Sequence, residues 1–304
     1  MSARPLIHIG YHKTATTWMQ RQLFTPSHGY HQIADHEDVF RHIVEPHGLR
    51  FSAQAMQAHI QQALPQLKTG EVPVISSEIL SGHPFFGGRE SDVYAARLAQ
   101  IAPDARILIS IRAQMKILPS VYMQYVLRGG TTPYQDFFSA ENPLGFFTFS
   151  PDHFKYDRLV GLYQQTFGKE NVCVVMQESL RSDINRLAKD IADFSGNTLF
   201  DGLKTSQSKE NASYPEYAVP LLRRINHLKK NVLNPTPMFN LGSVADFLFR
   251  TVGYACRSQP MKKNFGDRRP VSDFVSKTFD GYYHDSNQRL SVLLDNKVDL
   301  SKYS

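Results

Sequence analysis

The chain has 304 residues, 41% of them apolar, and a formal net charge of +6. This length and composition suit one large domain with insertions and a packed core. Because the positive charge is spread without a long Lys/Arg run, it argues against a nucleic-acid-binding tail and suits an anionic nucleotide or acceptor.

The two cysteines, Cys173 and Cys256, are too few for a disulfide framework, and no C-x-x-C or Cys/His cluster indicates a metal site. No run of about eighteen uncharged apolar residues predicts a membrane span, and no apolar leader follows basic residues at the start. We therefore expect a soluble, cytoplasmic protein. The sequence does not specify an oligomeric state.

Four apolar runs have the length of strands, and each ends in, or is followed by, a polar stretch. They are residues 5–9, 72–78, 106–112 and 172–176. Such continuous runs are typical of parallel strands that are covered on both faces. Segments with helical spacing lie at about 16–24, 53–67, 90–101, 113–127, 156–167, 183–195 and 215–228.

The alternation of these segments predicts an α/β fold. We expect a mostly parallel, doubly wound sheet with helices on both faces and a phosphate-binding loop after the first strand. We expect a single domain over residues 1–304, mainly helical from about residue 214.

Three segments fit this alternation less well. Residues 28–36 form a polar, His-rich segment whose histidines are expected on the surface or in loops, and residues 131–150 are expected to form an irregular segment. The aromatic residues of the latter are either part of an acceptor-site wall or packing filler, namely Phe137, Phe138, Phe146, Phe147 and Phe149. The basic residues within 262–269 indicate either a flap over a cofactor or a solvated face.

The first strand leads through Gly10 into a short polar loop and then into a helix beginning near Thr16. The first N–H groups of a helix have no intrahelical partner and lie at the positive end of its dipole, so a phosphate can bind there. Lys13 and the hydroxyls of Thr14, Thr16 and Thr17 supply further donors. The alternative is that the threonines only cap the helix.

The lysine spacing excludes an ordinary Walker A loop, in which lysine comes seven residues after the first glycine. Here Lys13 comes three residues after Gly10. The spacing resembles the loop with which sulfotransferases bind the 5′ end of 3′-phosphoadenosine 5′-phosphosulfate (PAPS), G-x-x-K-[ST]-G-T-T-[WL]. The matching residues are His12, Lys13, Thr14, Ala15, Thr16, Thr17 and Trp18, with Ala15 in place of the family's usual glycine.

Two further stretches resemble the same family, in its bacterial, carbohydrate- or Golgi-like type. Arg112 ends an apolar strand and Ser120 follows eight residues later on the next helix, which resembles the R-x₇-S element that binds the 3′-phosphate. Spacing alone also fits a surface arginine and an unrelated serine. Asn211 and Ser213 resemble the late N-x-S loop that approaches the nucleotide in bacterial members.

The resemblance implies in-line transfer of a sulfuryl group from PAPS to the hydroxyl of a glycan, glycolipid or small metabolite, with PAP as product and no metal. Lys13 would stabilise charge on the leaving phosphate. Glu78, at the end of the second apolar run, is the preferred base, with His83 or His12 as alternatives. The alternative interpretation is that Glu78 forms a surface ion pair or caps a helix and has no part in catalysis.

Two other function classes share the strand, loop and helix. A P-loop nucleotide kinase should also show a Walker A loop and a Walker B aspartate that holds Mg²⁺, and the lysine spacing argues against it. A non-catalytic nucleotide-binding protein would keep the loop and lack the base.

Overall fold

The computed structural model describes residues 4–139, 148–204, 214–237 and 239–303. The chain forms two compact units. The first comprises Met1–Ala113, Asp152–Gln207 and Tyr283–Ser304, and the second Gln114–Pro151 and Ser208–Tyr282. The expectation of one domain over the whole chain stays a prediction.

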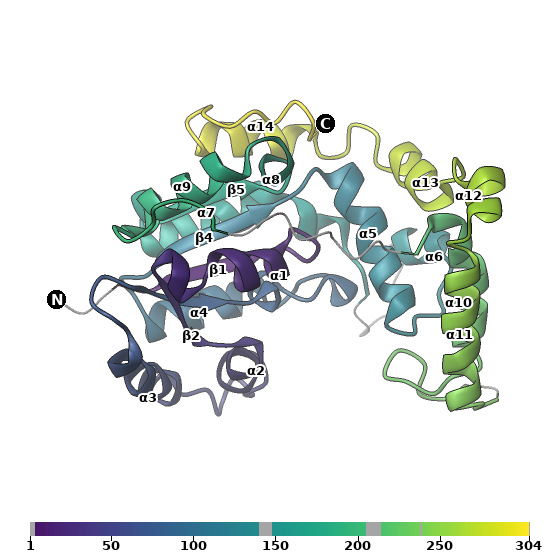
Figure 1. Cartoon of the computed structure of the whole chain (residues 1–304), viewed down its shortest axis with the longest axis horizontal. Coiled ribbons are helices and arrows are strands. Elements are labelled where there is room, and N and C mark those ends of the chain that lie inside the picture. Colours follow the sequence, from purple (N-terminus) through teal and green to yellow (C-terminus); the bar gives the residue numbers. More distant parts are fainter. Residues whose placement is uncertain (1–3, 140–147, 205–213, 238, 304) are drawn as a thin grey trace. The chain divides into compact units, whose positions relative to one another are not determined.

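The first unit contains a five-stranded sheet in the order β2-β3-β1-β4-β5, with every neighbouring pair parallel (Figure 1). Its strands are β1 Leu6–Gly10, β2 Tyr30–Ala34, β3 Val72–Ser76, β4 Arg106–Ile111 and β5 Val172–Met176. Strand β1 is central, with Leu6 opposite Val74 of β3 and Arg106 of β4. The predicted α/β class with a parallel sheet is confirmed.

Helices flank both faces of this sheet (Figure 1). The α-helices of the first unit are α1 Thr16–Trp18, α2 His36–Val39, α3 Ala53–Ala63, α4 Ser91–Ile101, α7 Tyr156–Phe167, α8 Ser179–Ser182, α9 Ile184–Ser195 and α14 His284–Leu293. A π-helix, η1 (Met19–Leu23), continues α1, and η3 (Phe40–Val44) similarly continues α2. The 3₁₀ helices are η2 Pro26–His28, η4 Leu64–Gln66, η5 Glu78–Ser81, η6 Pro84–Phe86, η7 Pro151–Phe154 and η8 Lys169–Asn171.

One buried cluster joins Met19 and Leu23 of the first helical segment to Leu6 of β1 and to Leu187 and Ile191 of α9. Helix α7 packs against β4 and β5 and also contacts α4 and α14. A central strand covered in this way explains why its sequence is a continuous apolar run.

The second unit is helical in the residues that the structure describes. Its helices are α5 Gln114–Leu127, α6 Tyr134–Ser139, η9 Glu216–Ala218, α10 Val219–Asn226, α11 Ser243–Ala255, α12 Gln259–Phe265 and α13 Pro270–Thr278. Helix α5 packs against α10 and α13, and α10 packs against α11. A Cβ at Gly130 would lie 2.2 Å from the ring of Tyr125, so glycine is required where the chain leaves α5.

Two of the sequence expectations were wrong. The histidines of segment 28–36 are not all on the surface or in loops, because His28 is buried and His31 lies on strand β2, in which Tyr30, Ile33 and Ala34 are buried. Polar His31 and Gln32 are tolerated there because β2 lies at the edge of the sheet. Part of the expected irregular segment 131–150 is likewise helix α6.

The aromatic residues of that segment are packing residues as far as they are described. Phe137, Phe138 and Phe149 are buried, and their rings lie 5.1 Å apart, centroid to centroid, in each pairing. They pack beside Tyr122 and Tyr125 of α5 within the second unit. This supports the packing interpretation, while Phe146 and Phe147 lie outside the described residues.

Candidate phosphate-binding site

The loop between β1 and α1 has an unusual backbone. Lys13 and Ala15 adopt the left-handed conformation, with φ of 69° and 68°. A Cβ at Gly10 would lie 2.5 Å from Thr16 Oγ1 and 2.7 Å from Ser110 Oγ. The loop therefore needs glycine at position 10 for a close approach, and it curls tightly enough to bring the start of α1 over the end of β1.

The start of α1 has the donors that an anion requires. Thr16 Oγ1 is buried and has no hydrogen-bond partner among the residues that the structure describes. Thr16 and Thr17 are the first residues of the helical segment, where backbone N–H groups have no carbonyl one turn earlier. Lys13 and Thr17 are exposed, while Trp18 packs against the core cluster. A phosphate oxygen would satisfy the buried hydroxyl of Thr16.

Thr14 is held inside the first unit, and its contact with a phosphate stays a prediction. It is fully buried, and its hydroxyl donates to the Tyr11 carbonyl at 2.6 Å and contacts Ser110 Oγ at 2.7 Å. The Thr14 hydroxyl therefore holds the loop on strands β1 and β4. A direct contact with phosphate would require it to leave these partners.

This contact is the end of a buried chain of hydrogen bonds across three strands. His8 on β1 contacts Ser76 Oγ on β3 through Nδ1 at 2.8 Å and Ser110 Oγ on β4 through Nε2 at 3.0 Å. Because Thr14 uses its proton on the Tyr11 carbonyl, Ser110 must donate to Thr14 and accept from His8 Nε2–H. Ser76 then donates to His8 Nδ1.

His8 is fully buried, and the removal from water lowers its pKa to about 3. The imidazole is therefore neutral near pH 7, as the hydrogen-bond directions require. No sequence motif surrounds His8, a single histidine inside an apolar strand, so the sequence alone does not indicate its place in this network.

The predicted base lies at the same edge of the sheet as the loop. Glu78 is the first residue of η5, two residues after β3 ends at Ser76, and β3 is a parallel neighbour of β1. Ser81 of η5 donates to the Gly10 carbonyl at 3.3 Å, which ties η5 to the loop. Lys13 and Glu78 therefore follow neighbouring parallel strands, and their catalytic roles stay predictions.

The two alternative bases are close to each other. The rings of His12 and His83 lie 5.8 Å apart, centroid to centroid. His83 Nδ1 accepts a hydrogen bond from the Phe85 N–H at 3.2 Å, which leaves Nε2 as the protonated nitrogen of the neutral ring. All three candidate bases therefore belong to one region of the first unit.

Arg112 meets the loop directly, because its Nη1 donates to the Lys13 carbonyl at 3.3 Å. The peptide group after Arg112 is held on both sides. Tyr156 donates its hydroxyl to the Arg112 carbonyl at 2.6 Å, and the Ala113 N–H donates to Glu178 Oε1 at 3.1 Å. The two sequence elements predicted to bind the two phosphates of one nucleotide thus come together at Lys13 and Arg112.

The other predicted ligands lie elsewhere in the chain. Ser120 is on α5 in the second unit, where its hydroxyl donates to the Lys116 carbonyl at 3.0 Å. The R-x₇-S spacing therefore spans the boundary between the units, which falls after Ala113. Asn211 and Ser213 lie outside the described residues.

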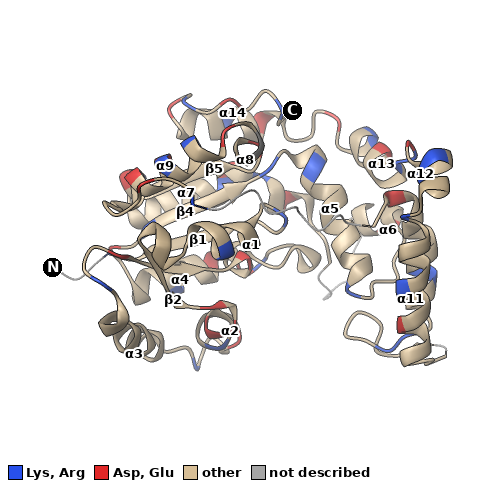
Figure 2. Cartoon of the chain, in the orientation of Figure 1, with Lys and Arg blue, Asp and Glu red and all other residues tan. Residues whose placement is uncertain are grey.

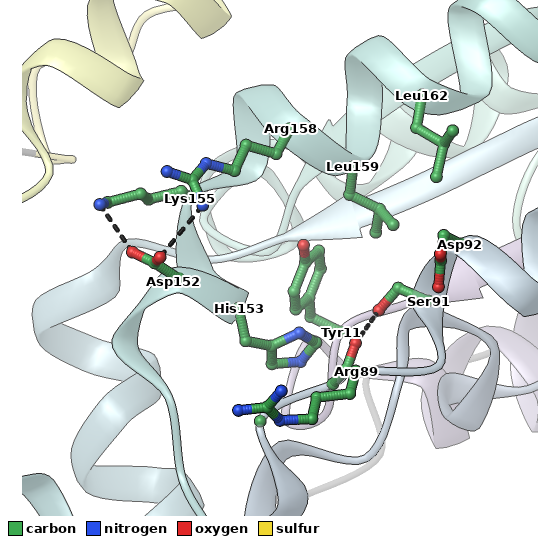
Figure 3. Close-up of a pocket in the computed structure, with 12 residues that line it drawn as sticks. Tyr11, Arg89, Ser91, Asp92, Asp152, His153, Lys155, Arg158, Leu159 and Leu162 are labelled. Carbon is green, nitrogen blue, oxygen red and sulfur yellow. Dashed lines mark hydrogen bonds and ion pairs between the residues drawn. The ribbon is translucent and has the colours of Figure 1, made fainter. Parts of the chain in front are cut away.

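A cavity of about 260 Å³ lies in the first unit beside Tyr11 (Figure 3). Its lining includes His153, whose ring centroid is 4.9 Å from that of Tyr11. Two of its basic side chains, Lys155 and Arg158, both pair with Asp152, at 2.6 and 3.1 Å. The lining contains none of Lys13, Glu78 and Arg112, so we do not assign this cavity to the phosphate groups.

Among the residues that the structure describes, no group of three or more His, Cys, Asp or Glu side chains is placed to hold a metal ion. In the same part of the chain, no helix combines the length and the apolar composition that crossing a membrane requires.

Comparison with known proteins adds information on the fold. No protein-family model and no curated protein matches the chain. The structure is similar to the crystal structure of a sulfotransferase from Alicyclobacillus acidocaldarius, with a TM-score of 0.50 and 22% sequence identity. The match covers 75% of this chain and 98% of that one. The chain therefore has a sulfotransferase-like fold.

Proposed function

We propose that this protein is a PAPS-dependent sulfotransferase that acts on an acceptor hydroxyl. The observation that carries the proposal is the hydrogen bond from Arg112 to the Lys13 carbonyl in the loop that leads into α1. At the start of α1, the buried hydroxyl of Thr16 has no hydrogen-bond partner among the described residues. A bisphosphate nucleotide needs two separate anion sites, and these residues supply both at one sheet edge. The sulfotransferase-like fold supports the same conclusion.

The roles follow from the placement of the side chains. The 5′-phosphate would lie on Lys13, Thr16, Thr17 and the first N–H groups of α1, and the 3′-phosphate on Arg112. PAPS supplies an activated sulfuryl group, whose bond to the phosphate oxygen breaks as a bond to the acceptor oxygen forms. Lys13 stabilises the charge that the leaving phosphate gains. Glu78 takes the proton of the acceptor hydroxyl.

The test is calorimetric binding of PAP with and without a chelator, repeated with ATP and Mg²⁺. We expect PAP to bind in both conditions. Arg112→Ala should weaken the binding of PAP by roughly tenfold or more, because a charge-assisted hydrogen bond is worth about 1.5–3 kcal/mol. Adenosine 5′-phosphosulfate has no 3′-phosphate, so its affinity for this variant should change little.

Arg41→Ala is the matched control, because Arg41 is an exposed arginine that pairs with Glu37 away from the loop. A need for Mg²⁺, or a preference for ATP over PAP, would contradict the sulfotransferase and favour a nucleotide kinase. If Arg112→Ala lowers the affinity for both nucleotides equally, Arg112 stabilises the fold and does not bind the 3′-phosphate.

A further inference from the structure

Helix α11 of the second unit is apolar on two sides. One side faces the rest of the unit, with Ala245 and Gly253 buried. A Cβ at Gly253 would lie 2.5 Å from the Tyr214 ring, so this side is tightly packed. The other side carries exposed apolar side chains, namely Val244, Phe247, Leu248 and Tyr254, which are 55%, 68%, 38% and 63% exposed.

These four residues form one stripe, because their spacing of three, four and ten residues from Val244 keeps them within one face of a helix. The segment before the helix adds Phe239 and Leu241, which are 63% and 43% exposed. We call these six residues the α11 face. Several exposed apolar side chains on one side of a helix differ from the single exposed apolar residues that are normal on protein surfaces.

The charge of the chain is concentrated in the same unit. Its two segments hold fourteen Lys and Arg against eight Asp and Glu, so the second unit carries the entire net charge of +6 and the first is neutral. Each of the helices α11, α12 and α13 carries at least one Lys or Arg (Figure 2). Exposed Arg250 lies at the margin of the α11 face, and Lys262 and Lys263 lie on the next helix.

We infer that the α11 face docks the protein on the surface of an anionic lipid bilayer. An apolar helix face flanked by cations is the combination that binds the headgroup boundary of such a membrane. Phe247 and Leu248 would enter the acyl boundary, and the lysines of α12 would contact lipid phosphates. A second copy of the chain is disfavoured as the occupant, because pairing two units of charge +6 is repulsive.

Flotation with lipid vesicles tests the inference. We expect the protein to bind vesicles of phosphatidylcholine mixed equally with phosphatidylglycerol, and to bind phosphatidylcholine alone much more weakly. The double variant Phe247→Ser/Leu248→Ser should bind the mixed vesicles roughly tenfold or more less tightly, because two apolar side chains no longer enter the boundary. Lys262→Gln/Lys263→Gln should weaken binding by a similar factor.

Val232→Ser is the matched control, since Val232 is 92% exposed in the same unit but outside the α11 face. Leu248→Ser/Tyr254→Ser is a second double variant if the first is poorly expressed. Unchanged binding of the folded double variants, or equal binding to both vesicle types, would overturn the inference. So would a dimer in light scattering that the double variants dissociate. PAP binding is measured separately, so failure of the proposed function leaves this result interpretable.

Discussion

At the scale of single residues, the loop stores backbone strain where the proposed chemistry takes place. Ala15 has a φ of 68° and a ψ of 26°, a conformation that glycine adopts freely and alanine at a penalty. The family pattern indicated that position 15 is unusual, since glycine is the usual residue there. Nothing in the sequence indicated the same conformation at Lys13, whose φ is 69°.

Ala15→Gly should therefore raise the free energy of unfolding by up to about 1 kcal/mol. The relief of left-handed strain outweighs the extra freedom that glycine gives the unfolded chain, which costs about 0.4–1 kcal/mol. Urea denaturation measures the change. Ala58→Gly is the control, because Ala58 is exposed in the middle of α3. This variant should lower the free energy of unfolding by about 1 kcal/mol. A loss of stability in Ala15→Gly would show that position 15 is unstrained.

Glu78→Gln should separate catalysis from binding. It keeps the shape of the side chain and removes the base, so turnover should fall on the order of 10²–10⁴-fold while PAP affinity stays near wild type. Lys13→Ala should reduce both, because in the proposed site the ammonium group would face the nucleotide before and during transfer. Turnover with an accepted hydroxyl substrate is the measurement. Normal turnover in Glu78→Gln would move the role of base to His83 or His12.

At the scale of elements, the sequence predicted those strands whose apolar composition matches their burial in the sheet. The runs that became β1, β3, β4 and β5 are continuous and apolar because helices cover both faces of the sheet. Strand β2 was not predicted, because polar His31 and Gln32 interrupt its sequence between the buried Tyr30 and Ile33, so no continuous apolar run marks it.

The residues of the candidate site could be predicted only where they belong to a short sequence motif. Gly10, Lys13 and Arg112 lie in recognisable spacings next to apolar strands. The hydrogen bonds of His8 with Ser76 and Ser110 join residues 68 and 102 positions apart, so they depend on the order of the strands, which no local pattern contains.

The hydrogen bonds between β3, β1 and β4 predict a loss of stability in acid. The buried His8 has a pKa of about 3, below its ordinary value of 6.5, so the unfolded chain binds its proton first as the pH falls. The contribution of neutral His8 to the free energy of unfolding is complete above pH 6.5. It is lost as the pH falls from 6.5 to 3, at about 1.4 kcal/mol per pH unit. His153, buried and also near 3, adds a second loss of the same sign.

Urea denaturation at pH 7 and pH 5 measures this loss. In His8→Gln the difference between the two pH values should shrink by about 2 kcal/mol, although the variant is less stable at pH 7. His47→Gln, at an exposed position, is the control. An unchanged difference in His8→Gln would mean that His8 is not held neutral in the folded chain.

At the scale of the whole molecule, residues far apart in the chain fix the strand end that presents Arg112. The Tyr303 hydroxyl donates to Glu178 Oε2 at 2.9 Å, and Glu178 Oε1 accepts from the Ala113 N–H. Tyr156 holds the carbonyl of the same peptide group. Residues 113, 156, 178 and 303 therefore set the backbone next to the proposed 3′-phosphate ligand, a long-range arrangement that no sequence motif indicated.

Tyr303→Phe should lower the free energy of unfolding by about 1–3 kcal/mol, because it leaves a part-buried carboxylate oxygen of Glu178 without its donor. It should also weaken PAP several-fold while leaving adenosine 5′-phosphosulfate nearly unchanged, since only the 3′-phosphate depends on Arg112. Tyr163→Phe is the matched control. Tyr163 is equally buried, but its hydroxyl has no hydrogen-bond partner among the described residues, so its removal should be neutral or slightly stabilising. If Tyr303→Phe destabilises the fold but affects both nucleotides alike, the contact supports the fold and does not position Arg112.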